Sequence, residues 1–320
     1  MKQWQFETLY QGQWQDFAEQ LSALEQGKAQ GNISPEFPAQ YRQLCQHLAI
    51  AQARHYSAVL IDQLQHLALR GHQQLYRHRS HLGGMILGFI LQGFPRLVRA
   101  QWRAVSLACL VFFGSLLGMG VLTYLFPELI YSLLSTERVL EMDQMYDSSR
   151  RKARNADDDW LMFGYYIFNN VSIAFQTFAS GLLAGVGSLF YLFFNGLVIG
   201  AIAGHLTEAG FGDAFWSFVI GHGAFELTAI ALAGAAGLKL GWSLLAPGQL
   251  RRSHALKMAS KTAIALVSGA FFFLLIAAFI EAFWSSSQLP AAIKYGVGAA
   301  LWILVLSYFV LAGRGEHAPE

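Results

Sequence analysis

The sequence predicts an all-α membrane protein: a polytopic bundle of about six transmembrane helices, preceded by a cytoplasmic helical hairpin. Two observations carry this prediction. The 320 residues are 54% hydrophobic and only 13% charged, whereas a soluble domain is about 25% charged. In addition, long apolar runs recur over residues 104–313, and a helix needs about 20 mostly apolar residues to cross a bilayer.

Composition also excludes several classes of protein. The net charge of +2 gives no basis for binding nucleic acid. Two cysteines, Cys45 and Cys109, cannot make a disulfide framework. Residues 1–25 are polar with scattered aromatics, which is unlike a cleavable signal peptide. We therefore expect insertion to begin at an internal segment.

Residues 1–82 are predicted to form a cytoplasmic helical region. Apolar side chains recur at three- and four-residue steps from Trp4 to Leu24 and again from about Glu36 to Leu69. Two such amphipathic helices make a hairpin that buries its apolar stripe against itself or a partner. The histidines and glutamines of this region repeat no metal-ligand spacing, and we interpret them as solvated faces.

Residues 83–103 are predicted to form an interfacial amphipathic helix. The apolar part, 83–94, is too short to span, and Arg96, Arg99 and Arg103 follow it. A short apolar helix flanked by arginine is typical of the inner membrane interface. A packed core helix is the alternative.

The transmembrane bundle is assigned to 104–313, with a short cytoplasmic tail at 314–320. The arginines before the first span place the N-terminus in the cytoplasm, and alternation then puts the basic loop at 251–261 and the C-terminus on the same side. The loop at 127–159 is expected outside, with an amphipathic start on the outer leaflet. Residues 181–190 are either a hairpin or a re-entrant element. The six expected spans cover 104–126, 160–183, 188–205, 215–245, 262–284 and 296–312.

Polar side chains interrupt the second, third and fourth spans. An ionisable group at membrane depth costs about 2.5–3.5 kcal/mol on insertion scales, so it usually has a partner or a task. His222 and Glu226 are four residues apart and share a helix face. Glu226 lies about eleven residues into its span, roughly 16 Å along the axis. The expected polar intramembrane cluster near mid-membrane is Asn169, Asn170, Asn195, His222 and Glu226.

We interpret this cluster as hydrogen bonding between helices, with a proton relay or a substrate contact as the alternative. His222 and Glu226 offer only two metal ligands on one helix, so no metal and no cofactor are predicted. His205 and Glu208 are expected to mark the water boundary, and Glu281 to reach the headgroups beside Trp284. The sequence has no nucleophile elbow, zincin motif or phosphate loop, so no catalytic residue and no enzyme activity are predicted.

The glycines of the same region predict close helix packing. Three of them recur every fourth residue in the third span, which leaves one smooth helix face for a neighbour. The predicted helix-packing glycines are Gly181, Gly185, Gly187, Gly196, Gly200, Gly204, Gly221 and Gly223.

These residues resemble the stage II sporulation protein M family of bacterial integral membrane proteins. The resemblance rests on Asn169-Asn170, the glycine turn 181–187, Asn195-Gly196 with Gly200, and above all the string 221–227, Gly-His-Gly-Ala-Phe-Glu-Leu. The long polar N-terminus looks like that of Gram-negative-type members. The resemblance implies the architecture, the inner membrane and the importance of Asn169, Asn195, His222 and Glu226. It implies no catalytic role, because the family's namesake is viewed as a scaffold for peptidoglycan hydrolases.

The function predicted from these observations is a non-enzymatic inner-membrane scaffold that organises envelope-associated partner proteins. A permease-like transporter with a polar midplane cluster is the first alternative, and an intramembrane metal-dependent hydrolase is a weaker one. The expected partners are membrane lipid and other membrane or envelope proteins, with no nucleic acid. A homodimer is plausible through the smooth glycine face.

Overall fold

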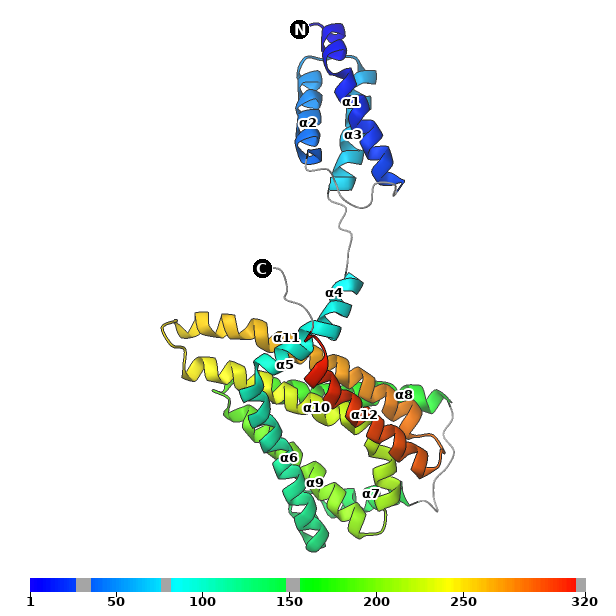
Figure 1. The fold of residues 1–320 in the computed structure, drawn as a ribbon, viewed down its shortest axis with the longest axis vertical. Coiled ribbons are helices and arrows are strands. Elements are labelled where there is room, and N and C mark those ends of the chain that lie inside the picture. Colours follow the sequence, from blue (N-terminus) through cyan, green and yellow to red (C-terminus); the bar gives the residue numbers. More distant parts are fainter. Residues whose placement is uncertain (27–35, 76–81, 148–155, 315–320) are drawn as a thin grey trace. The chain divides into compact units, whose positions relative to one another are not determined.

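The computed structural model describes residues 1–26, 36–75, 82–147 and 156–314, and every regular element in these ranges is a helix. The chain divides into two compact units, Met1–Gly83 and Gly84–Glu320 (Figure 1). The expected tail at 314–320 lies outside the described residues except for Arg314, and so do residues 148–155 of the expected outer loop.

The N-terminal unit has three helices: α1 (Gln3–Glu25), α2 (Phe37–Ala53) and α3 (Ala58–Leu75). Our prediction of a hairpin with one second helix over 36–69 is therefore wrong. The expected helix is interrupted at His55, whose φ of 52° is left-handed and stops an α-helix. The Ser57 hydroxyl then accepts a hydrogen bond from the Leu60 amide at 3.4 Å and starts the next helix.

The three helices share one hydrophobic core, to which each contributes the stripe that the sequence pattern predicts. Its buried members are Phe6, Trp14, Phe17 and Leu21 of α1, Phe37, Leu44 and Ala51 of α2, and Leu60, Leu64, Leu67 and Ala68 of α3. The unit thus has a hydrophobic core of its own.

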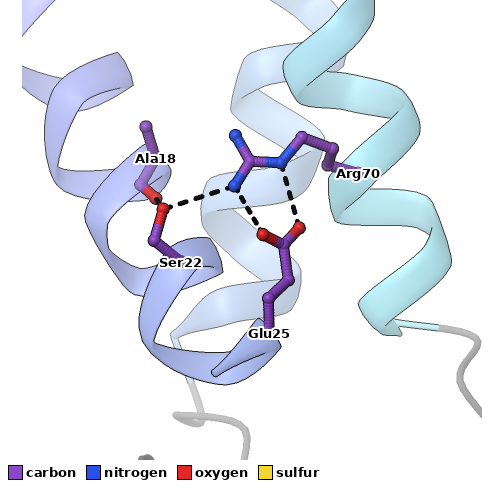
Figure 2. A network of polar contacts seen from close by, with 4 residues as sticks. All are labelled: Ala18, Ser22, Glu25 and Arg70. Atoms are coloured by element: carbon purple, nitrogen blue, oxygen red, sulfur yellow. Dashed lines mark hydrogen bonds and ion pairs between the residues drawn. The ribbon is translucent and has the colours of Figure 1, made fainter. Parts of the chain in front are cut away.

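Polar contacts also join these helices, among them one made by Trp14 and one made by Arg70. Trp14 Nε1 donates to His47 Nδ1 at 3.1 Å inside the core, and burial lowers the pKa of His47. Figure 2 shows the second contact, in which Arg70 donates to both carboxylate oxygens of Glu25 at 3.0 and 2.8 Å, and to Ser22 Oγ at 3.3 Å. These hydrogen bonds lower the pKa of Glu25. Because the Glu25 side chain is 38% exposed, the ion pair contributes at most about 1 kcal/mol.

The segment before the first span is helical throughout, and its side chains change from exposed at its start to partly buried at its end. It consists of α4 (Leu82–Gly88), the π-helical η1 (Phe89–Gly93) and α5 (Phe94–Ala100). Described residues of α4 are exposed, whereas the Phe94 ring is buried against Gly269. Arg99 Nη1 donates to the Phe309 carbonyl at 2.7 Å. The second half of this segment is therefore part of the bundle, and membrane contact by α4 stays a prediction.

Five helices of the second unit are long and apolar enough to cross a membrane. They are α6 (Trp102–Leu125), α9 (Val186–Glu208), α10 (Gly212–Leu245), α11 (Arg252–Phe279, continued by the π-helical η5, Ile280–Ser285) and α12 (Ala291–Leu311). Together they confirm a multi-pass helical membrane protein. A further helix, α8 (Ala156–Ala179), coincides with the second expected span.

Helix α10 is the centre of this unit. It contacts α6, α8, α9, α11 and α12, and Figure 1 shows it running beside α11 and α12. In the apolar 18-residue stretch of α10, 67% of the residues are buried, against 17% in the corresponding stretches of α6 and α12. Most residues in the apolar middle of α10 are therefore packed against protein.

Helices α6 and α9 pack on each other through the predicted glycine face. A Cβ added at Gly196, Gly200 or Gly204 would come closer than 3.0 Å to the backbone of α6. Small residues at a membrane-helix interface allow this close approach of two backbones.

The other predicted glycines differ among themselves. Gly181 lies against Gly237 of α10, and Gly187 against Ser180 in the turn between α8 and α9. Gly185 has a φ of 84°, so its conformation favours glycine, whereas an added Cβ would stay 3.7 Å from its nearest neighbours. At Gly221 and Gly223 an added Cβ would stay 3.4 Å or more from its neighbours. Close helix packing therefore does not require glycine at those two positions.

The segment after α6 is folded onto the bundle. It contains η2 (Pro127–Ser132) and α7 (Thr136–Tyr146). Ile130 and Val139 are buried in one cluster with Ala201 of α9. Its apolar face, which we expected on the outer leaflet, thus packs on protein.

Candidate functional site

The candidate site is built around His222 and Glu226 on α10. His222 Nε2 lies 3.8 Å from Glu226 Oε2, as expected for side chains one helical turn apart. The His222 side chain is 5% exposed and that of Glu226 is 18% exposed. Both polar groups are thus withdrawn into the bundle, as the sequence predicts.

A third ionisable side chain, Glu281, reaches the same place from η5. One ligand atom from each of His222, Glu226 and Glu281 lies within 4.8 Å of the other two. Glu281 is buried, with 9% of its surface exposed. Our expectation that this carboxylate reaches the headgroups is wrong, because η5 faces α10 and the side chain points into the bundle.

Two more polar residues surround this group. His222 Nδ1 and Ser285 Oγ are 3.0 Å apart, so the ring nitrogen that faces away from Glu226 is also held. Lys294 of α12 is buried, and its Nζ donates to the carbonyls of Ser285 and Ser287, each at 2.7 Å. The site therefore joins α10, η5 and the start of α12.

The asparagines make other hydrogen bonds. Asn169 Nδ2 donates to Asn170 Oδ1 at 2.9 Å, and Asn195 Nδ2 donates to the Tyr191 carbonyl of its own helix at 2.7 Å. Within the part of the chain that the structure describes, these amides thus do not join His222 and Glu226 in a hydrogen-bonded cluster. Residues at a similar depth on different helices can still point in different directions. Depth alone therefore does not predict which side chains are in contact.

His205, the other histidine singled out, pairs with a residue that we did not consider. Its Nε2 lies 2.9 Å from Asp143 Oδ1 of α7, and Glu208 is exposed. This contact fastens α7 to the end of α9.

One signal in the sequence points to Glu281. It comes four residues after Ala277 and four before Ser285, and all three are buried on one side of α11 and η5. A carboxylate on the small-residue face of a span is directed at a neighbouring helix. We gave more weight to its closeness to Trp284 and to the end of the span.

The family model described as stage II sporulation protein M matches residues 106–286, more than half of the 320 residues. The chain belongs to this family. The stage II sporulation protein M match runs from α6 to the end of η5 and includes His222, Glu226, Glu281 and Ser285; Lys294 lies beyond it. The Gram-negative type stays a prediction.

The N-terminal unit has a match of its own. A family model described as a domain of unknown function (DUF8413) covers residues 4–77, which contain α1, α2 and α3. Among curated proteins and among solved structures, nothing matches this member of the stage II sporulation protein M family.

Proposed function

We propose that this chain is a non-enzymatic scaffold of the bacterial inner membrane that organises envelope-associated proteins. The observation that supports it best is the division into a membrane unit and a separate N-terminal unit with its own core. Because this unit has a hydrophobic core of its own, we expect it to fold without the membrane helices and to offer its surface to partners. The scaffold role implied by the family resemblance agrees with this, and sporulation itself is not extended to this chain.

The arrangement that we propose has six spans, with α8 as the second, and both termini in the cytoplasm. Arg96, Arg99 and Arg103 precede α6, and Arg251 and Arg252 stand at the start of α11. Basic residues concentrate on the cytoplasmic side of membrane proteins. In this arrangement the N-terminal unit would bind cytoplasmic partners, and the segments that follow α6 and α11 would bind periplasmic ones.

Partner capture tests the scaffold proposal. The tagged full-length chain is crosslinked in native membranes, and the captured proteins are identified by mass spectrometry. We expect a defined set of envelope proteins, part of which is lost when residues 1–75 are replaced by an unrelated helical domain of similar size. The Glu208→Gln chain, altered at an exposed carboxylate, is the control and should retain the whole set. A set no richer than that of an unrelated multi-pass protein contradicts the proposal.

A permease-like role is the second candidate, and the buried group at His222, Glu226 and Glu281 is the observation that favours it. Ionisable residues in membrane helices often mark proton or solute pathways. In proteoliposomes, a transporter would lose proton-coupled flux in Glu226→Gln, while the exposed-site control Glu208→Gln would keep it. Flux in Glu226→Gln equal to that of the wild-type chain rules this candidate out.

A further inference from the structure

We propose that His222, Glu226 and Glu281 bind one divalent transition-metal ion, with zinc as the type ion, between α10 and the end of α11. The three side chains come from two helices and converge with their ligand atoms within 4.8 Å of one another. The sequence pattern offers only the first two residues, on one helix. The third ligand comes from the tertiary structure, and three protein ligands are the usual number in zinc sites that keep an open position.

The donor chemistry suits such an ion. Zinc takes imidazole nitrogen and carboxylate oxygen at about 2.0–2.2 Å, which places two tetrahedral ligand atoms about 3.4 Å apart. His222 Nε2 and Glu226 Oε2 are already 3.8 Å apart. The three ligand atoms lie within 4.8 Å of one another, so binding an ion would draw them together by at most about 1.4 Å.

Ser285 orients the imidazole for this role. Its Oγ lies 3.0 Å from His222 Nδ1. When the ring proton is on Nδ1, this N–H donates a hydrogen bond to the Ser285 hydroxyl oxygen. The lone pair of Nε2 then faces the two carboxylates. Metal-bound histidines almost always have such an oxygen partner on the second ring nitrogen, which fixes the tautomer and the ring plane.

Charge gives a further argument. Two carboxylates held together away from water repel each other and lose their hydration. Lys294 brings one positive charge to the same end of the bundle, where its ammonium donates to the Ser285 and Ser287 carbonyls. A divalent cation between Glu226 and Glu281 offsets both carboxylates directly. This inference does not rest on the scaffold proposal, because an ion that fastens α11 to α10 would serve a scaffold or a transporter.

Metal titration of the full-length chain in detergent tests the site. After treatment with a chelator, the chain is titrated with Zn²⁺ in competition with a chromophoric chelator. We expect one ion per chain. Glu226→Gln, Glu281→Gln and His222→Gln should each weaken binding by much more than about tenfold, and Ser285→Ala, which only positions the ring, by about tenfold. Glu208→Gln removes an exposed carboxylate at the end of α9 and should leave the affinity unchanged.

The absorption spectrum of bound Co²⁺ gives an independent reading on the unaltered protein. We expect a d–d band in the wild-type chain that differs from Co²⁺ in buffer and is displaced by Zn²⁺. A wild-type chain without this band overturns the proposal, even if the variants fail to fold. Zinc affinity in Glu281→Gln equal to that of the wild type, with both chains helical and monodisperse, also overturns it and indicates an adventitious ion only. Capture of the same partners by Glu281→Gln would leave the scaffold proposal standing in either case.

Discussion

His47 shows how burial of a single residue makes the N-terminal unit sensitive to pH. The imidazole is buried between α1 and α2, and its Nδ1 accepts the hydrogen of Trp14 Nε1. A protonated imidazolium carries a hydrogen on both ring nitrogens and cannot accept that bond. Burial also disfavours the charged form, which is why the pKa of His47 is lowered from 6.5.

We therefore expect the N-terminal unit to lose stability as the pH falls below 6.5, the pKa of an ordinary histidine. Because the pKa is lower in the folded state, the unfolded chain binds the proton first. The contribution of His47 is complete above 6.5 and is lost as the pH falls through the folded pKa. Hydrogen exchange of α1 and α2 peptides in the full-length chain, corrected for intrinsic rates, measures this loss between pH 7.5 and 5.

His47→Gln should remove most of that pH dependence, because the glutamine amide oxygen can accept from Trp14 but does not titrate. His66→Gln, at an exposed position on α3, is the matched control and should respond to pH as the wild-type chain does. An equal loss of protection in wild-type and His47→Gln chains would assign the effect to another group.

At the scale of helices, α6 and α9 depend on the absence of side chains at their interface. Gly200 faces the carbonyl of Leu116, and Gly204 faces that of Gly120. Backbone atoms cannot move aside as a flexible side chain can. In contrast, Gly118 of α6 has no atom within 4 Å of an added Cβ, so it has room for the side chain that Gly200 and Gly204 of α9 exclude.

Gly200→Ala is expected to lower the free energy of unfolding by about 1–3 kcal/mol, the usual cost of overpacking. Gly118→Ala should leave it unchanged or raise it by up to about 1 kcal/mol, since alanine favours the helix. Circular dichroism during SDS titration measures both chains under the same conditions. If the two variants unfold at the same SDS concentration, contact between α6 and α9 does not limit the stability of the bundle.

At the scale of the whole molecule, the function depends on which side of the membrane each connection faces. Gln249 lies in the connection between α10 and α11, and Ala312 follows α12. The proposed six-span arrangement places both in the cytoplasm, because the α11–α12 hairpin crosses the membrane twice between them.

Topology reporters test this arrangement. Fusions after Gln249 and after Ala312 should read cytoplasmic, and a fusion after Leu289, between η5 and α12, should read periplasmic. A periplasmic reading at Gln249 or Ala312 would contradict six spans with both termini inside. Periplasmic readings at both positions would fit five crossings, by the spans other than α8, with the N-terminal unit still in the cytoplasm.

Much of the architecture follows from the sequence, because hydropathy and helical periodicity are local properties. The apolar runs locate the membrane helices, and the step of four residues puts His222 and Glu226 on one face. The same step predicts the glycine face of α9, which packs against α6. The interruption at His55 is harder to predict, because it is a left-handed backbone turn at a residue type with no strong turn signal.

Only the tertiary structure decided which distant side chains meet. The Asn195 amide donates to the Tyr191 carbonyl of its own helix, and the fold of α7 gives His205 the partner Asp143. At the candidate site, η5 is a π-helix, whose wider turn shifts the residues after Phe279 out of the regular α-helical register. Glu281 and Ser285 both belong to this element, and both lie beside His222. Periodicity placed His222 and Glu226 on one helix face, and the packing of α11 against α10 brought Glu281 beside them.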